Sequence, residues 1–232
     1  MNKVGLLIIA TGKYDCFIEQ LLRSVDKHFF YGQPIDIYLF VDNPYNIGHS
    51  LRMNIVQIPI EHKPFPYATL YRYKYFDTHK SLITSDYIFY LDVDMRIEAD
   101  INKEIIGDIV CVQHPGFYKG GWGSASCDER SLAYLAKDKM VGYMAGGFQG
   151  GSRSEYLEAC CVLRARIDSD EMRGVMAEWH DETHWNWYLK TLAKNILTLD
   201  CSYCYPEAKW FNGTGFTRRI VALDKNHDKM RS

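Results

Sequence analysis

Two aspartates separated by one residue follow a strongly apolar stretch near the middle of the sequence. Residues 86–91 read Asp-Tyr-Ile-Phe-Tyr-Leu and lead into Asp92-Val93-Asp94. A short run of aromatic and β-branched residues predicts a buried strand, and residues two apart on an extended chain share one face. We therefore expect Asp92 and Asp94 to converge, and two hard oxygen ligands suit Mg²⁺ or Mn²⁺ carrying a substrate diphosphate. The alternative is a strand-terminal turn whose acids face water.

A second cluster at residues 178–186 is the densest group of polar and aromatic side chains in the chain, Glu-Trp-His-Asp-Glu-Thr-His-Trp-Asn. His180 and His184 stand four apart, which puts them on one face of a helix. Zinc proteases use that spacing, but Asp181 occupies the position where those enzymes have Glu, so a zinc hydrolase is a distant alternative. An acid of this cluster could instead meet a sugar's anomeric carbon, because glycosyl transfer passes through a cationic transition state. A capped amphipathic helix with solvated acids would explain the same residues without chemistry.

Two further segments could complete a site for a phosphorylated sugar. Residues 143–151 read Tyr-Met-Ala-Gly-Gly-Phe-Gln-Gly-Gly, and glycines permit close approach of the backbone to another group. The C-terminal residues 225–231 are basic, and in most proteins Lys225 and Arg231 would be ordinary surface charges. In a diphosphate-binding enzyme, such a tail can fold over the phosphates and neutralise the leaving group.

The composition excludes several classes of function. Of the 232 residues, 47% are hydrophobic and 24% are charged, which is typical of a globular protein. The net charge of −2 gives no basic surplus for binding nucleic acid. No apolar run approaches the length of a transmembrane segment, and the short run after Lys3 makes a poor signal peptide. Seven scattered cysteines, an odd number, predict reduced thiols and a cytoplasmic location.

The elements that must position these residues alternate between strands and helices. Strands are expected at 4–10, 35–41, 54–60 and 109–113 and in the run before Asp92. Helices are expected from Tyr14 or Asp15, from Tyr67 to Leu82, from about Ser152 to Ser169 and from the 178–186 cluster through Leu192. This alternation predicts an α/β fold with a mostly parallel sheet and crossover helices. Such sheets bind ligands at the carboxyl ends of their strands. We see no repeat or linker, so one domain over 1–232 is predicted.

Together these blocks resemble glycosyltransferase family 6, the family of the histo-blood-group A and B transferases and the α-1,3-galactosyltransferase. The matching segments span nearly the whole chain: Ala-Thr-Gly-Lys-Tyr at 10–14, Asp-Val-Asp at 92–94, His-Pro-Gly-Phe-Tyr at 114–118, Gly-Gly-Phe-Gln-Gly-Gly-Ser at 146–152, Trp-His-Asp-Glu-Thr-His at 179–184 and Lys-Asn-His-Asp-Lys-Met-Arg at 225–231. The Trp-His-Asp-Glu block is the most specific of these, whereas Asp-x-Asp alone would be weak.

The resemblance implies a single-domain GT-A fold, Rossmann-like, with a mostly parallel central sheet flanked by helices. About residues 1–95 would hold UDP, and about residues 96–232 would hold the donor sugar and the acceptor and end in a phosphate-binding tail. The positions that match donor and UDP contacts are Ile8, Ala10, Tyr14, Asp42, Arg72, Asp92, Val93, Asp94, Ala145, Gly146, Gly147, Asp181, Lys225 and Arg231. Those that match or border the acceptor site are His114, Trp179, Glu182 and Trp185. Asp92 and Asp94 would hold Mn²⁺ or Mg²⁺, and Glu182 matches the catalytic carboxylate.

The activity that the resemblance implies is retaining transfer of GalNAc or Gal from UDP to O3 of a galactoside, a fucosylated acceptor of the H-antigen type, forming an α-1,3 linkage. Gly147 matches the position where the blood-group A enzyme has Gly and galactose users tend to have Ala, which favours UDP-GalNAc. The chain resembles a soluble bacterial or phage-borne member, since it lacks the tail, membrane anchor and stem of the animal enzymes. It keeps both aspartates where many bacterial relatives carry Asn-x-Asn and work without metal. A UDP-Gal-specific enzyme and a non-catalytic carbohydrate-binding protein remain the alternatives.

Overall fold

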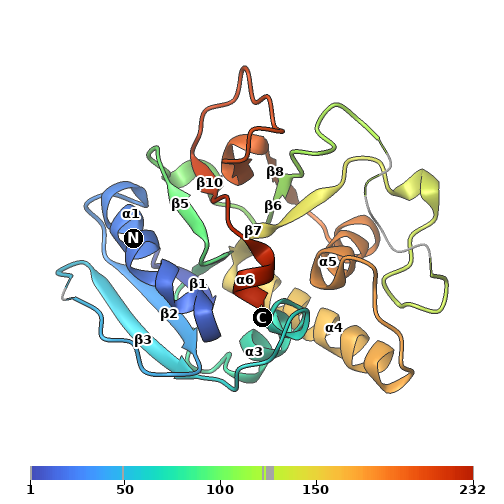
Figure 1. The fold of residues 1–232 in the computed structure, drawn as a ribbon, viewed down its shortest axis with the longest axis horizontal. Coiled ribbons are helices and arrows are strands. Elements are labelled where there is room, and N and C mark those ends of the chain that lie inside the picture. Colours follow the sequence, from blue (N-terminus) through green and yellow to red (C-terminus); the bar gives the residue numbers. More distant parts are fainter. Residues whose placement is uncertain (1, 49, 122, 124–127, 232) are drawn as a thin grey trace.

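The strands at the centre of the protein form one twisted sheet (Figure 1). The computed structural model describes residues 2–48, 50–121, 123 and 128–231. Within these residues, seven strands pair in the order β3-β2-β1-β4-β7-β6-β8. Their bounds are β1 (Val4–Ala10), β2 (Ile35–Val41), β3 (Met53–Pro59), β4 (Tyr87–Leu91), β6 (Ile109–Gln113), β7 (Met144–Ser152) and β8 (Ile196–Leu199).

The neighbouring strands of this sheet run parallel except at β7, which is antiparallel to both β4 and β6. The predicted α/β fold with a mostly parallel central sheet flanked by helices is therefore confirmed, and it is consistent with the GT-A fold. The strands expected at 4–10, 35–41 and 109–113 have those bounds, and the strand expected at 54–60 begins and ends one residue earlier. The predicted strand before Asp92 is β4.

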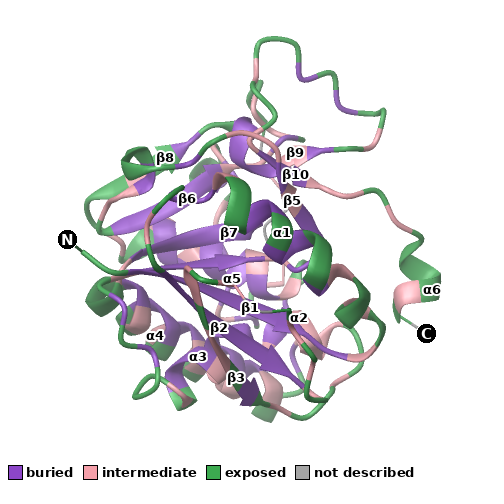
Figure 2. Cartoon of the chain, turned by 90° about the vertical axis from the view of Figure 1, so that its left-hand side faces the viewer, coloured by how far each residue is buried: buried purple, intermediate pink, exposed green. Residues whose placement is uncertain are grey.

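Helices cover both faces of the sheet, as the continuous apolar sequence of β1 requires. Leu6 and Ile8 belong to the core on the side of α1 (Ile18–His28). Leu7 and Ile9 belong to the core on the opposite side, which is covered by α3 (Arg72–Thr78), α4 (Arg153–Met172) and α5 (His180–Thr191). Buried residues consequently follow the strands, and exposed residues follow the outer faces of the helices (Figure 2).

A small second sheet brings the C-terminal part of the chain beside the aspartate pair. Its order is β5 (Met95–Ile97), β10 (Ile220–Ala222) and β9 (Tyr205–Pro206), with β10 antiparallel to β5. Just after β10, the backbone N–H of Leu223 donates to the carbonyl of Asp94 at 3.1 Å. The chain then forms α6 (His227–Arg231), which stands in front of the central sheet in Figure 1.

Four short 3-10 helices complete the described elements: η1 (Gly12–Phe17), η2 (Lys103–Ile105), η3 (Lys137–Lys139) and η4 (Cys201–Cys204). The helix expected from Tyr14 or Asp15 thus begins as η1 and continues as α1. The helix expected from about Ser152 is α4, which extends to Met172. In the part of the chain that the structure describes, no helix combines the length and apolar character that crossing a membrane requires.

The prediction of one continuous helix from Tyr67 to Leu82 is wrong. The structure has two short helices, α2 (Tyr67–Leu70) and α3, with Tyr71 outside helical geometry between them. Arg72 begins the second helix and is only 2% exposed, although its sequence pattern set it apart from the hydrophobic stripe. A buried guanidinium needs acidic and carbonyl partners, and Arg72 finds them at the strand ends described next.

Candidate active site

A cavity of about 860 Å³ lies at the carboxyl ends of β1 and β4. Its walls come from both halves of the chain, so the fold joins segments that are far apart in the sequence. The predicted site residues that line it are Tyr14, Asp92, Val93, Asp94, His114, Ala145, Gly147, Glu182, Lys225 and Arg231. Ligand sites of α/β sheets lie at this end of the strands.

Asp92 and Asp94 lie on the cavity wall as predicted, and each has partners within the protein. Asp92 accepts a hydrogen bond from the Tyr90 hydroxyl and lies 3.5 Å from Nη2 of Arg72. Burial, together with the charge of Asp94, raises the pKa of Asp92 to about 6, although Arg72 opposes the shift. Asp94 forms an ion pair with Lys225 from the C-terminal segment.

The donor set suits a hard divalent ion that keeps open positions. Among the described residues, no group of three or more His, Cys, Asp or Glu side chains could hold a metal ion by itself. Two carboxylates completed by substrate phosphate oxygens are a usual way of binding Mg²⁺. The raised pKa of Asp92 shows a carboxylate whose charge is incompletely compensated by its neighbours. Asp92 and Asp94 therefore fit the Mn²⁺ or Mg²⁺ that the resemblance implies.

Arg72 lies beneath the cavity, where it links four elements. Its Nη2 lies 3.0 Å from Oδ2 of Asp181 in α5, and its Nη1 donates to the carbonyl of Gly146 in β7 at 2.7 Å. The guanidinium carbon also stands 4.1 Å above the ring of Tyr90 in β4. Arg72 and Asp181 are thus buried behind the wall. Both residues are predicted donor contacts, and neither is among the residues that line the cavity.

Glu182, in the first turn of α5, presents its carboxylate to the cavity. Its Oε2 accepts the backbone N–H of Gly146 at 2.7 Å. Burial raises the pKa of Glu182 to about 7, and the hydrogen bond from Gly146 opposes that rise. The backbone carbonyl of the next residue, Gly147, accepts the backbone N–H of Asp92 at 2.9 Å. Two adjacent glycines of β7 therefore contact Glu182 and Asp92, and both acids line the same cavity.

The C-terminal segment contributes Lys225 and Arg231 to one side of the cavity. Lys225 reaches Asp94, and the guanidinium of Arg231 stands 3.7 Å from the centre of the Phe65 ring. Nζ of Lys13 donates to the carbonyl of Lys229 at 3.0 Å, which ties the tail to the loop after β1. Cations from two ends of the chain therefore gather at a wall that also carries the carboxylates of Asp92, Asp94 and Glu182.

Several predicted residues lie outside the cavity wall. Ile8 and Ala10 are buried in β1. Asp42 accepts the N–H of Gly12 at 3.2 Å and so holds the loop after β1. Trp179 is exposed just before α5 and is absent from the described cavity lining.

The expectation that Trp185 borders the sugar sites is not met in this structure. Its side chain is fully buried and packs against Tyr156 and Tyr188, with ring centroids 6.1 Å and 6.0 Å away. Trp185 follows Asp181 by four residues, so the two side chains share one face of α5. That face points into the core towards Arg72 and α4.

His114 does line the cavity, at the end of β6. Its Nδ1 accepts the N–H of Gly116 at 3.0 Å, and its ring packs against Phe117 and Tyr143. Burial lowers the pKa of His114 to about 4, so the imidazole is neutral at physiological pH. A neutral imidazole can exchange hydrogen bonds with a sugar hydroxyl without adding charge.

The sequence analysis missed several residues of the cavity wall, among them Met95, Cys204 and Trp210. Met95 directly follows the aspartate pair and could have been found by extending that motif one residue. Cys204 and Trp210 belong to η4 and to the loop after β9, which no periodic pattern marks. Only the small second sheet brings them to the site.

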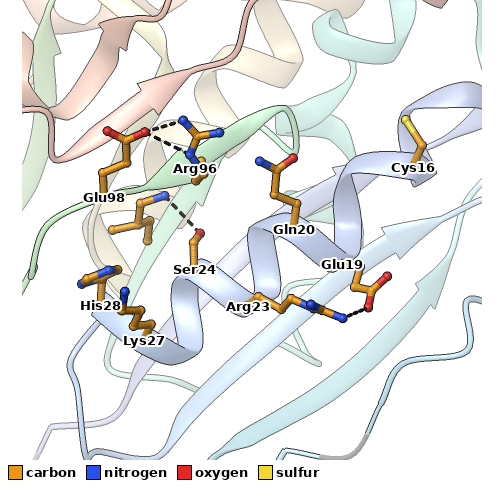
Figure 3. A pocket seen from close by; sticks show the side chains of 10 residues that line it. Cys16, Glu19, Gln20, Arg23, Ser24, Lys27, His28, Arg96 and Glu98 are labelled. Carbon is orange, nitrogen blue, oxygen red and sulfur yellow. Dashed lines mark hydrogen bonds and ion pairs between the residues drawn. The ribbon is translucent and has the colours of Figure 1, made fainter.

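A second hollow, of about 770 Å³, lies between α1 and β5 (Figure 3). Its charged side chains pair with one another, Arg23 with Glu19 at 2.5 Å and Arg96 with Glu98. Mutually neutralised charges on an open surface are typical of a solvated face. The convergent acids and cations are in the larger cavity, which is therefore the candidate active site.

Comparisons with known proteins agree with the family that the sequence motifs resemble. The model of glycosyltransferase family 6 matches residues 2–232. The histo-blood group ABO system transferase 1 of Rattus norvegicus is 28% identical over 240 residues, which cover 99% of this chain and 68% of the relative. The globoside alpha-1,3-N-acetylgalactosaminyltransferase 1 of Gallus gallus is 28% identical over 239 residues, with 99% and 69% covered. The O-antigen biosynthesis glycosyltransferase WbnI of Escherichia coli is 26% identical over 231 residues, with 97% and 96% covered.

The raised pKa of Glu182 makes a prediction about stability. The folded protein favours the neutral carboxyl, so this stabilisation is present below the unfolded pKa and is lost as pH rises through about 7. Glu182→Gln keeps an acceptor for Gly146 and removes the charge. We expect the variant to exceed the parent in free energy of unfolding by about 1–3 kcal/mol at pH 8, with little difference at pH 5. Urea denaturation at both pH values measures this.

The exposed Glu178 supplies the matched control, since Glu178→Gln removes a charge from the same segment at the surface. Its effect on stability should be small at both pH values. A Glu182→Gln protein that is less stable than the parent at pH 8 would contradict the assignment of a desolvated carboxylate.

Proposed function

The chain belongs to glycosyltransferase family 6, and from this premise we propose that it transfers GalNAc, or Gal, from UDP to O3 of a galactoside with retention of configuration. The product would carry an α-1,3 linkage, and a fucosylated galactoside of the H-antigen type is the proposed acceptor. The supporting observation is the adjacency created by β7: Gly146 holds Glu182 and Gly147 contacts Asp92. A carboxylate for the anomeric carbon and an acid suited to the leaving diphosphate thus line one cavity and are linked through neighbouring residues of β7.

The leaving group would be stabilised by charge from three parts of the chain. The bond between the anomeric carbon and the diphosphate breaks, and its electron pair departs with UDP. Lys225 and Arg231 line the same cavity and would neutralise the developing negative charge. Asp92 and Asp94 would hold Mn²⁺ or Mg²⁺, which when bound supplies further positive charge at the diphosphate. The tail that carries both cations also covers this side of the cavity and limits the access of water.

Glu182 would act on the anomeric carbon of the breaking bond, whereas the cations act on the diphosphate. Its carboxylate can stabilise the cationic sugar or attack its anomeric carbon, and both roles require the ionised form. The N–H of Gly146 fixes Oε2 at 2.7 Å, so the position of the carboxylate is set before the donor binds. The acceptor oxygen then bonds to the anomeric carbon, displacing the Glu182 carboxylate where that group has attacked, and its proton passes to a phosphate oxygen of the departing UDP. His114, which is neutral and lines the same cavity, is placed to orient that acceptor.

Glu182→Gln tests the catalytic assignment. We expect UDP release from UDP-GalNAc, with Mn²⁺ and 2′-fucosyllactose, to fall about 100-fold or more, because the transition state loses its opposing charge. The affinity for UDP should change by less than about threefold, since the carboxylate meets the sugar rather than the nucleotide. Unchanged turnover would overturn the assignment. Wild-type protein that binds sugar but releases no UDP with any acceptor would instead favour the carbohydrate-binding alternative.

The paired substitution Asp92→Asn and Asp94→Asn tests the metal site. Amide oxygens are weaker ligands for Mn²⁺ or Mg²⁺ than carboxylates, so the response of UDP release to Mn²⁺ and to EDTA should disappear. Isothermal titration of the protein with MnCl₂ and UDP gives a readout independent of turnover. Asp138→Asn is the control, because Asp138 is exposed and absent from the described cavity lining. A double variant that still responds to Mn²⁺ would refute the site.

The choice of donor sugar would depend on Gly147 together with Met95. A β-carbon at Gly147 would overlap the terminal methyl of Met95 and lie 3.0 Å from Oδ2 of Asp92. The sequence suggested open space at this glycine, but the flexible Met95 side chain fills it. A thioether can move aside for a bulky substituent on the sugar's C2. We therefore propose UDP-GalNAc as the favoured donor and UDP-Gal as the alternative.

Substitutions at this pair should affect activity non-additively. We expect Gly147→Ala to lower kcat/KM for UDP-GalNAc by about 10–200-fold, because the new methyl displaces Met95 and Asp92. Met95→Ala removes the overlap, so the double variant should recover activity, and more with UDP-Gal than with UDP-GalNAc. Initial rates with UDP-Gal, UDP-GalNAc, UDP-Glc and UDP-GlcNAc measure this. Simple additivity of the two substitutions would show that Met95 has no part in donor choice.

A further inference from the structure

Trp210 is a large aromatic side chain that stays exposed at the cavity. It is 63% exposed and yet lines the cavity together with His114 and Glu182. Among the exposed large hydrophobic residues that the structure describes, Phe65 also lines this cavity, but the guanidinium of Arg231 covers its ring. Trp210 therefore offers an apolar surface that folding has left uncovered.

The loop that carries Trp210 is held in place by an aromatic cluster. Phe211 is buried, and its ring centroid lies 5.0 Å from Tyr205, 5.7 Å from Tyr118 and 6.3 Å from Phe216. The ring of Trp210 lies 5.8 Å from Phe211, edge to face. Such contacts add to the energy of burial. The cluster fixes the base of the loop, so the position of Trp210 beside the cavity is a consequence of packing.

The same cluster joins Trp210 to the segment of His114. Tyr118 lies 5.2 Å from Phe216 and 5.7 Å from Phe211, and it ends the 114–118 segment whose first residues, His114 and Pro115, line the cavity. In Figure 1 the loop between β9 and β10 projects at the top of the molecule, away from β2 and β3. The nucleotide-facing tail is a separate segment, α6. Trp210 and His114 thus belong to one packed unit on the cavity wall.

We infer that Trp210 binds the glycan acceptor, with its indole packed against the apolar face of a pyranose ring. A sugar ring presents C–H groups on one face and hydroxyls at its edges, so it suits a site that combines an apolar aromatic face with nearby polar groups. His114 and Glu182 supply polar groups on the same wall. This inference rests on the proposed function, and it adds a residue that the sequence motifs do not include.

The test compares the parent with Trp210→Ala, Trp210→Phe and Tyr31→Ala. Tyr31 is 72% exposed and absent from the described cavity lining, so it controls for loss of a surface aromatic. UDP release is measured from UDP-GalNAc and Mn²⁺, without acceptor and across concentrations of 2′-fucosyllactose. We expect Trp210→Ala to raise the acceptor KM about tenfold or more, as truncation of a buried-contact Trp does. Donor hydrolysis without acceptor and the melting temperature should stay unchanged, and Trp210→Phe should recover part of the acceptor affinity.

Binding to an array of immobilised glycans, with UDP present, gives a second readout that needs no turnover. We expect the glycans bound by the parent to lose about tenfold or more of their signal with Trp210→Ala and to keep it with Tyr31→Ala. Equal acceptor KM and equal array binding in the parent and Trp210→Ala would overturn the inference even if transfer occurs. Failure of the parent to transfer, with array binding that depends on Trp210, would refute the proposed function and leave sugar binding by Trp210 supported.

Discussion

The buried guanidinium of Arg72 is the interaction on which the rest of the site depends. It contacts Asp181 of α5, Asp92 after β4 and the carbonyl of Gly146 in β7, and it stands over the ring of Tyr90. A buried cation without partners is strongly destabilising, and so is a buried pair of acids without a cation. Each group therefore requires the others, and four elements from distant parts of the sequence are held in one arrangement.

Glycines in β7 convert that arrangement into a reactive geometry. At Gly146 a β-carbon would lie 3.3 Å from Oδ2 of Asp181 and 3.4 Å from Oε2 of Glu182, and at Gly147 it would meet Met95 and Asp92. The absence of side chains lets the acids approach the strand from both sides. Gly150 and Gly151, later in the same strand, serve a different purpose, because a β-carbon at either would overlap backbone atoms of Ile88 or Asp108. The first two of these glycines therefore make room for side chains of the candidate active site, and the last two allow close packing of the backbone.

The cavity combines desolvated acids with cations from the C-terminal segment. Burial raises the pKa of Asp92 to about 6 and of Glu182 to about 7, so both acids are poised to respond to an arriving positive charge. Lys225 and Arg231 come from the C-terminal segment, whose helix α6 has no buried residues. The acids thus lie at the ends of a strand and a helix, and the cations lie on a terminal segment. This arrangement suits a site that binds and releases a diphosphate.

The sequence by itself determined the α/β alternation, the apolar strands at 4–10, 35–41 and 109–113, and the motifs that identify the family, because these are local patterns of residue type. It also placed Asp92, Asp94, Glu182, Gly147 and Lys225, which the structure brings to one cavity. The tertiary structure alone decided the break at Tyr71, the burial of Arg72 and of Trp185, the occupation of the Gly147 space by Met95, and the exposure of Trp210 beside His114. These features depend on contacts between residues tens to more than a hundred positions apart, and a periodic pattern of residue types carries no information about such contacts.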